Sequence, residues 1–431
     1  MAQVGVPSVQ SAAFAELLIE SGLITEDQLA IARAAKAKTG SHIDEVLMSL
    51  GLVSPDVLRV LIARTWGLAP LEVANPHRDD ELIRRWSGQL MLAENWMPVR
   101  RAFDGTIVVA TARVPDAERR SQIEGHLGEP VHFEAATSWD IRHIVLDVFR
   151  TAIADQAANE LYRQSPELSA RVVFSRGQKV GLIATVAILL VLLVLFPSAV
   201  IVGLIAAVSL VFLAGTVFKF FIAMLGARFD VVERVSDADV AALNDRDVPK
   251  YSVLVPVFRE ANIVAQLVGN LGKIDYPVDK LEVLVLIEEE DTITRDAFLA
   301  ANPPAHFQIV TIPKGAPQTK PRACNVGLFF ATGDLLVIYD AEDTPDPDQL
   351  KKAVVAFRRG GDKTVCIQAS LNYFNAEENV LTRMFTLEYS YWFDYMLAGL
   401  DAADLPIPLG GTSNHFRTSA LIELGGWDPY N

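Results

Sequence analysis

The sequence lacks features that would suit a secreted or a nucleic-acid-binding protein. It has two cysteines, Cys324 and Cys366, in 431 residues, which excludes a disulfide-stapled secreted fold and favours a reducing compartment. Its formal net charge is −15, so we expect no nucleic-acid partner, because a general basic field is missing. The first apolar run is broken by Glu16 and Glu20 and has no basic leader, so we expect no secretory signal peptide.

Two common nucleotide-binding signatures are also missing. No Gly-x-Gly-x-x-Gly and no Gly-x-x-x-x-Gly-Lys-Ser/Thr accompanies a predicted strand. A Rossmann dinucleotide site and a P-loop are therefore not indicated. Any phosphate ligand has to be held in another way, most simply by a metal ion.

Apolar residues, in contrast, are abundant, at 51% of the chain. Residues 180–196 and 199–218 contain no charge and would form helices of roughly 25 and 30 Å. Pro197-Ser198 lies between them. We predict a transmembrane helical hairpin over residues 180–225; the alternative is a buried hairpin of a soluble domain, which would normally carry a polar stripe.

Basic residues flank both ends of this apolar segment. They are Arg171, Arg176 and Lys179 before it and Lys219, Arg228 and Arg234 after it. Because positive charge stays on the cytoplasmic side, we predict a multi-pass protein of a bacterial inner (cytoplasmic) membrane with both soluble regions in the cytoplasm. The lipid bilayer is then a partner.

Residues 10–160 are predicted to form a small α+β domain. Gly22 and Gly51, 29 residues apart, each stand in a Gly-Leu-Ile/Val turn between two amphipathic helices, which indicates a tandem helical pair. Thr25 followed by Gln28 predicts a capping box. Residues 95–113 are typical of a β-hairpin turning at Asp104-Gly105, residues 131–133 of a strand, and residues 139–161 of a helix.

This arrangement resembles the amino-terminal domain of type II secretion and type IV pilus assembly ATPases, over roughly residues 10–150. In that family a repeated Arg-Leu-Gly helps to bind cyclic di-GMP. Here the corresponding positions are Ala13-Phe14-Ala15 and His42-Ile43-Asp44. They lack the arginine that forks onto phosphate and the glycine that permits close approach. We therefore predict a docking or packing domain, with cyclic di-GMP binding as the alternative.

Residues 250–431 are predicted to form an α/β domain. Strand-like runs at 251–257, 281–287, 308–312 and 335–339 alternate with helix-like runs at 261–271, 296–301 and 322–332. Such alternation predicts a parallel, doubly wound sheet with its site at the carboxyl ends of the strands. Charged residues follow all four strands: Arg259, Glu260, Glu288, Glu289, Glu290, Asp291, Lys314, Asp340, Glu342 and Asp343.

The fourth strand is followed at once by three acids, Asp340, Glu342 and Asp343. Carboxylates at a strand end suit Mg²⁺ or Mn²⁺, which prefers oxygen ligands and leaves positions free for phosphate. The alternative is a surface turn, because Thr344-Pro345-Asp346-Pro347 follows. The charged residues at the neighbouring strand ends favour the metal and phosphate site.

Five sequence motifs, which follow one another along residues 250–431, indicate a resemblance to a second family. They are Pro256-Val257-Phe258-Arg259-Glu260, Lys320-Pro321-Arg322-Ala323-Cys324-Asn325, Asp340-Ala341-Glu342-Asp343, Gly410-Gly411-Thr412-Ser413-Asn414-His415-Phe416-Arg417 and Gly425-Gly426-Trp427-Asp428. Together they resemble membrane-bound family 2 glycosyltransferases, inverting enzymes with the GT-A fold that are related to cellulose and other β-glycan synthases. The resemblance implies a nucleotide-sugar donor, most simply a UDP-sugar, a glycan acceptor and synthesis of an extracellular or cell-envelope polysaccharide.

The resemblance also implies roles for individual residues. Donor-binding residues would be Pro256, Glu260, Glu289, Asp291, Lys320, Asn325 and Asp340. Metal ligands would be Asp340 with Glu342 or Asp343, because Glu342 replaces the second acid of the family's Asp-x-Asp motif. Acceptor-binding residues would be Gly410, Gly411, Asn414, His415, Trp427 and Asp428. The alternatives are a solvated loop charge for Lys320, a structural role for His415 and a buried anchor for Trp427.

Inverting transfer needs a base to deprotonate the acceptor hydroxyl. In the family this base is an aspartate shortly after Gly-Gly-Trp-Asp, which would lie beyond Asn431. We therefore interpret the chain as an incomplete enzyme with no catalytic base of its own, expected to bind donor weakly and to transfer nothing. Two alternatives are a degenerate glycosyltransferase-like membrane receptor or scaffold, and a regulator that responds to cyclic di-GMP through residues 10–150.

Overall fold

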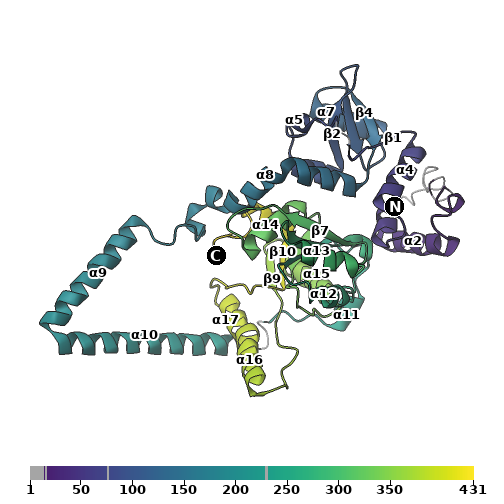
Figure 1. Ribbon diagram of the computed structural model, residues 1–431. Helices are drawn as coiled ribbons and strands as arrows, with labels where there is room; N and C mark the ends of the chain where they lie inside the picture. The colour runs from purple at the N-terminus through teal and green to yellow at the C-terminus, as the bar shows by residue number, and fades with distance from the viewer. Residues whose placement is uncertain (1–13, 15–16, 75–76, 229–231) are drawn as a thin grey trace.

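The computed structural model describes residues 14, 17–74, 77–228 and 232–431. It shows a small amino-terminal domain, a central α/β domain and a projecting arm of two long helices (Figure 1). Two of the predicted nucleotide-contact positions, Ala13 and Ala15, lie outside the described residues.

The amino-terminal domain combines helices with a four-stranded sheet of order β1-β4-β3-β2. The strands are β1 (Ala69–Pro70), β2 (Trp96–Arg101), β3 (Ile107–Thr111) and β4 (Val131–Ala135). The helices are α2 (Glu26–Thr39), α3 (Ile43–Ser49), α4 (Pro55–Trp66), α5 (Asp80–Ile83), α6 (Gly88–Glu94), α7 (Ala117–Leu127) and α8 (Ser138–Gln164). β2 and β3 pair antiparallel across the predicted turn.

The predicted internal repeat is present in the backbone. Gly22 and Gly51 both adopt the left-handed conformation, with φ of +66° and +68°, and both donate their N–H three residues back, to Ile19 and Met48. Glycine suits these positions because a side chain disfavours positive φ. Thr25 and Gln28 form the predicted capping box.

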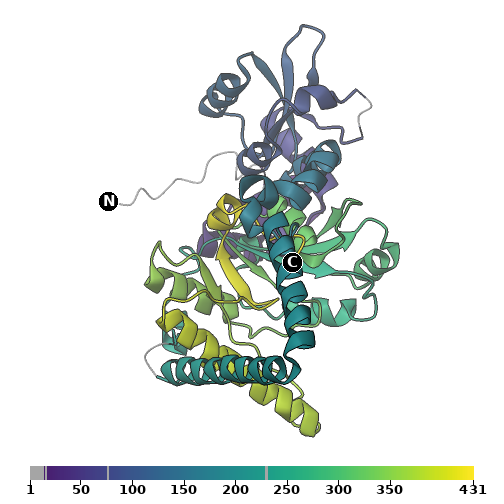
Figure 2. The ribbon, with the colours of Figure 1, turned by 90° about the vertical axis from the view of Figure 1, so that its left-hand side faces the viewer.

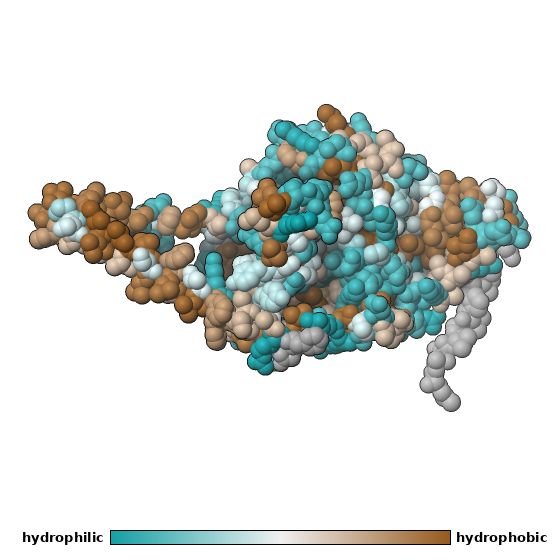
Figure 3. Space-filling view, turned by 90° about the horizontal axis from the view of Figure 1, so that it is seen from below, coloured by the Kyte–Doolittle hydropathy of each residue, from teal (hydrophilic) through white to brown (hydrophobic). Residues whose placement is uncertain are grey.

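Helices α9 (Arg176–Leu195) and α10 (Pro197–Gly226) form the arm. Both are long and apolar enough to cross a membrane, and their apolar windows are not buried by the described chain. The arm carries a nearly continuous hydrophobic surface (Figure 3). The two helices meet at Phe196 and Pro197 and diverge from this junction (Figures 1 and 2). Because they are apolar on all sides, no single stripe defines a face for mutual packing.

The central domain is built on a six-stranded sheet of order β7-β6-β5-β8-β10-β9. The strands are β5 (Tyr251–Val257), β6 (Leu281–Glu288), β7 (Phe307–Ile312), β8 (Leu335–Ile338), β9 (Cys366–Gln368) and β10 (Asn414–Arg417). The helices are α11 (Asp237–Ala241), α12 (Val264–Leu271), α13 (Thr292–Ala300), α14 (Lys320–Phe330), α15 (Gln349–Gly360), α16 (Val380–Ser390), α17 (Leu397–Ala402) and α18 (Thr418–Glu423), with a π-helix over Tyr391–Met396 between α16 and α17.

The sheet is mixed, which corrects the prediction of a parallel sheet. β7, β6, β5 and β8 are parallel, but β10 runs antiparallel to both β8 and β9. Four residues of the predicted acceptor-side loop form β10, with Asn414 opposite Ile338 and Arg417 opposite Leu335. The two missed strands are only three and four residues long, too short to show a pattern of alternation.

Helix α8 joins the amino-terminal and central domains. Its residues Val145, Val148, Ile153 and Ala157 belong to the same buried cluster as residues of β5, β6 and α14, such as Leu284. α8 and α14 thus cover one face of the central sheet, while α12, α13 and α15 pack on the other. α8 lies between the amino-terminal sheet and the central domain (Figures 1 and 2).

Candidate functional site

The carboxyl ends of β5, β6 and β8 meet at one edge of the central sheet. Val257 pairs with Ile287 and Leu254 with Ile338 in parallel register, so the segments that follow these strands leave the sheet together. This brings Glu260, Glu289 and Asp340 to the same edge, as the sequence predicted. In open α/β sheets this edge is where ligands bind.

Carboxylates crowd one another at this edge. Burial raises the pKa of Glu260, and the negative charges of Glu342 and Asp340 raise it further. Such crowding is relieved by a divalent cation, the strongest local positive charge that a site can take. Within the ranges that the structure describes, no three His, Cys, Asp or Glu side chains are grouped as a metal site. One or two carboxylates fit Mg²⁺ nevertheless, because substrate phosphates and water complete its coordination.

The two candidates for the second metal ligand have different surroundings. Asp343 accepts a hydrogen bond from the Asp340 backbone N–H at 2.7 Å and one from the Thr412 hydroxyl, and burial raises its pKa. Glu342 is exposed. Asp343 therefore connects the end of β8 to the segment before β10, while no such connection is made by the exposed Glu342 among the hydrogen bonds of the described residues.

Lys320 bridges two predicted parts of the site. It begins α14, and its ammonium donates to the Asp340 carboxylate and, at 2.6 Å, to the carbonyl of Gly411. A solvated loop charge would make neither contact. Lys320 thus connects a predicted metal ligand with the predicted acceptor loop.

The segment after β6 is held by Asp291. Its carboxylate accepts from the backbone N–H of Arg259 at 2.6 Å and of Thr294 at 3.1 Å. Burial disfavours the charged form, but these hydrogen bonds outweigh it and lower the pKa of Asp291 below its ordinary value. Asp291 therefore caps α13 and fixes the loop after β5, in which Arg259 has a φ of +57°.

Glu289 is paired with a residue from the other domain. Its carboxylate forms an ion pair with Arg150 of α8, and this contact lowers the pKa of Glu289. Sequence reasoning missed Arg150, which lies 139 residues away in a predicted helix with no motif around it.

Asn325 joins three backbone segments. Its amide donates to the carbonyls of Ala157 in α8, at 2.9 Å, and Trp427, at 2.8 Å, and accepts from the N–H of Trp427 at 2.8 Å. A Cβ at Gly426 would clash with its carbonyl oxygen, so only glycine fits there, at a φ of +79°.

The remaining predicted acceptor residues divide between the surface and the interior. Trp427 is half-buried and packs edge-on against Phe416, as a buried anchor would. Asp428 accepts from the Ser169 hydroxyl at 3.0 Å and from the Ala170 N–H. These two donors lie just before the arm formed by α9 and α10.

His415 is fully buried on β10, and its Nδ1 lies 2.6 Å from the Tyr251 hydroxyl. Burial lowers its pKa to about 3, so the ring is neutral, as the structural alternative requires. Asn414, also buried, donates to the carbonyl of Gly410. Pro256 is half-buried within β5.

Arg322, in the Lys-Pro-Arg-Ala-Cys-Asn motif, is a further residue near the site for which the sequence predicted no role. Arg322 is completely buried, donates to the Pro313 carbonyl and lies 3.7 Å from Glu288. It connects the carboxyl ends of β6 and β7 beneath the site. An arginine inside the Lys-Pro-Arg-Ala-Cys-Asn motif was the available signal.

Comparison with known proteins shows that the central domain is similar in sequence to glycosyltransferases. Residues 249–431 match the family model "Glycosyltransferase like family 2". The probable glycosyltransferase YdaM of Bacillus subtilis is 28% identical over 192 residues, 43% of this chain and 44% of that protein. A beta-monoglucosyldiacylglycerol synthase of Nostoc is 27% identical over 184 residues, 42% of this chain and 38% of that protein.

Among solved structures, a mannosyltransferase from Pyrobaculum calidifontis in complex with GDP-Man and Mn²⁺ is similar with a TM-score of 0.40 and 21% identity. The similarity covers 52% of this chain and 58% of that chain. The matches to YdaM and to the Nostoc synthase span less than half of each relative's length.

Proposed function

We propose that residues 249–431, which match glycosyltransferase family 2, bind the donor of an inverting glycosyltransferase that uses a nucleotide-diphosphate sugar, with UDP-sugars as the first candidates. The whole protein would build an extracellular or cell-envelope polysaccharide. The observation that carries this proposal is the parallel register of β5, β6 and β8, which brings Glu260, Glu289 and Asp340 to one edge of the sheet. The negative charges of Glu342 and Asp340 also raise the pKa of Glu260, and repulsion between carboxylates favours a cation and its phosphate ligand.

Asp340 and Glu342 are the residues that would hold Mg²⁺ or Mn²⁺. The bound cation supplies positive charge to stabilise the departing diphosphate. Asp343 holds the backbone N–H of Asp340 in place, and Lys320 adds a second positive charge beside the Asp340 carboxylate. Glu260 and Glu289, with Asp291 fixing the loops between them, would face the nucleoside.

The acceptor side would be formed around Gly410 and Gly411. The Gly411 carbonyl is already held by Lys320, and the Gly410 N–H donates to Gln368 at 2.8 Å. Asn414, His415, Trp427 and Asp428 would support this loop from behind. Of these, Trp427 and Asp428 remain partly accessible to a sugar.

The amino-terminal domain is proposed to be a docking domain. Lys38 forms an ion pair with Asp245 at 2.6 Å, and Thr39 donates to the buried Asp279 of the central domain. Asp44, at one of the positions that correspond to the cyclic di-GMP motif, lies in the first turn of α3. Its negative charge would repel a phosphate group there. These contacts favour packing over cyclic di-GMP binding.

The donor proposal can be tested by isothermal titration calorimetry on the detergent-purified chain. We expect UDP to bind in the presence of Mn²⁺ or Mg²⁺ and EDTA to weaken this binding. Asp340→Asn should weaken it at least about tenfold, a loss of about 1.4 kcal/mol. Asp346→Asn, which changes an exposed acid of the same turn, is the matched control and should leave affinity unchanged.

The competing function is a degenerate receptor or scaffold without catalysis. The ion pair between Lys320 and Asp340 favours it, because it neutralises the carboxylate without a metal. A scaffold predicts no UDP binding with either cation. UDP binding that is the same with EDTA and in Asp340→Asn would overturn the metal site while leaving a nucleotide site.

A further inference from the structure

Helix α8 of the amino-terminal domain, with the segment just after it, contacts three residues predicted to bind substrate. Arg150 pairs with Glu289, and the Ala157 carbonyl accepts from Asn325. Ser169 and Ala170, just beyond the helix, donate to Asp428. One continuous segment of the amino-terminal region therefore touches both the donor side and the acceptor side of the proposed site.

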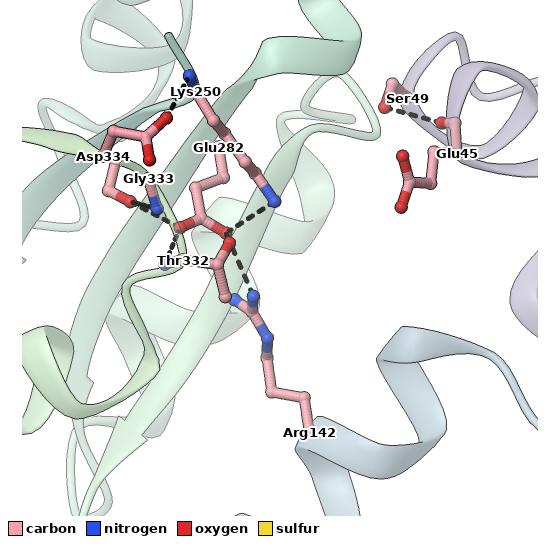
Figure 4. Close-up of polar contacts among 9 residues, drawn as sticks. Glu45, Ser49, Arg142, Lys250, Glu282, Thr332, Gly333 and Asp334 are labelled. Carbon is pink, nitrogen blue, oxygen red and sulfur yellow. Dashed lines mark hydrogen bonds and ion pairs between the residues drawn. The ribbon is translucent and has the colours of Figure 1, made fainter. Parts of the chain in front are cut away.

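A buried ionic contact fixes α8 against the start of β6. The Glu282 carboxylate is buried and contacts Arg142 of α8 at 3.0 Å, Lys250 at 4.0 Å and the Thr332 hydroxyl at 3.0 Å (Figure 4). Ser252 donates to the same carboxylate. Breaking such a buried pair is costly, because it leaves an uncompensated charge. The position of α8 along the sheet is thus defined.

Arg150 lies eight residues after Arg142 and reaches the other end of the same strand. Its Nη2 contacts one oxygen of Glu289, Oε2, and the backbone N–H of Lys314 is a second hydrogen-bond donor to this carboxylate. Two positive groups act on Glu289, Arg150 from α8 and Lys314 from the segment after β7, and Asp147 acts on Arg150 from within α8. A hydrogen bond between a guanidinium and a carboxylate is charge-assisted and directional, so it restrains the orientation of the carboxylate.

We propose that Arg150 is a positioning residue that holds Glu289 in the orientation needed by the donor nucleoside, so that the amino-terminal domain sets donor affinity through α8. This rests on the proposed function, because it requires Glu289 to face the donor. The contacts with Glu282, Asn325 and Asp428 make the effect a property of the domain interface, since α8 and the segment just after it contact all three residues.

The proposal is tested on the full chain by measuring UDP affinity calorimetrically, in the presence of Mn²⁺, for Arg150→Ala, Glu289→Ala and the double variant. We expect Arg150→Ala to weaken binding about two- to fivefold, the range of a partly exposed ion pair. In the Glu289→Ala background the same change should have no further effect. Arg163→Ala is the matched control, because Arg163 is also on α8 but pairs with Asp155 of the same helix.

Two additional measurements separate positioning from a general loss of structure. Arg150→Lys should recover part of the affinity, because it restores a positive charge next to Glu289 without the planar guanidinium. UDP affinity should fall at low pH as Glu289 becomes protonated. In Arg150→Ala this fall should begin at a higher pH, because Glu289 loses the partner that lowers its pKa. Protonation of UDP itself affects wild type and Arg150→Ala equally, so it does not contribute to the difference between their pH profiles.

The outcomes are distinguishable. If wild-type protein binds no UDP, the proposed function fails and this proposal fails with it. If wild type binds UDP but Arg150→Ala binds equally well, only the role of Arg150 is overturned. That role is also overturned if the effects of the two single variants simply add in the double variant, because Arg150 then does not act through Glu289.

Discussion

Glutamates of the central domain have opposite surroundings although they look alike in the sequence. Glu260 lies among other acids, and burial and their charges raise its pKa. Burial alone would also raise the pKa of Glu282, but the charges of Lys250 and Arg142 and the hydrogen bonds from Ser252 and Thr332 lower it to about 2. A carboxylate that is crowded by like charge suits a cation, and one that is surrounded by donors serves the fold.

The surroundings of Glu282 predict that the free energy of unfolding depends on pH. The pKa of this glutamate falls from an ordinary 4.5 to about 2 on folding, so its ion pairs stabilise the fold above about pH 4.5 and lose this effect as the pH falls toward 2. We expect Glu282→Gln to lower the free energy of unfolding by about 3 kcal/mol at pH 7. The difference should shrink below pH 4.5, as measured by thermal or denaturant unfolding in detergent. A difference that stays constant down to pH 3 would contradict this assignment.

At the scale of elements, two helices of the amino-terminal domain begin with the same capping motif in different environments. Thr25 and Gln28 cap α2 at the surface, whereas Thr137 and Asp140 cap α8 in the interior. Asp140 also forms an ion pair with Arg59 of α4. The α8 cap therefore links helix initiation to packing between helices.

This contrast predicts different costs for the same substitution. Thr25→Ala should destabilise the protein by about 0.5–1 kcal/mol, and Thr137→Ala by about 2 kcal/mol, because the second leaves the buried N–H of Asp140 without an acceptor. Thr137→Ser keeps the hydroxyl and should recover most of the loss. The unfolding midpoints of the three variants provide the measurement, and equal costs at the two sites would show that burial of the cap is unimportant.

At the scale of the whole molecule, the arm formed by α9 and α10 leaves and rejoins the rest of the chain on the same side (Figure 1). α9 starts shortly after the Ser169–Asp428 contact, and the end of α10 packs against the π-helix and α17 of the central domain. A Cβ at Gly226 would clash with the Tyr395 carbonyl oxygen, so this packing is close. Both soluble domains are then expected to lie on one face of the bilayer.

This arrangement predicts a specific protease pattern in a bacterial host. Protease added to spheroplasts should leave both soluble domains intact, whereas protease added to inverted inner-membrane vesicles should degrade both. The full chain should resist alkaline extraction, and a variant without residues 176–226 should be released. Cleavage of one domain in intact spheroplasts would exclude the two-span topology.

The sequence by itself determined the elements with strong local patterns. β5 has the predicted bounds, the Gly22 and Gly51 turns are equivalent, and the charged residues that follow β5, β6 and β8 do meet at one edge. These features depend on periodicity and turn chemistry within a few residues, which a sequence displays directly. The domain limits and the roles of the site residues remain predictions.

Only the tertiary structure decided which partners these residues have. It placed the short strand β10 antiparallel beside β8, buried His415 against Tyr251, and engaged Asp343 with Thr412 while leaving Glu342 exposed. It also brought Arg150 to Glu289. Such contacts join residues that are tens to more than a hundred positions apart, and they follow from how whole helices and sheets pack, which no local pattern records.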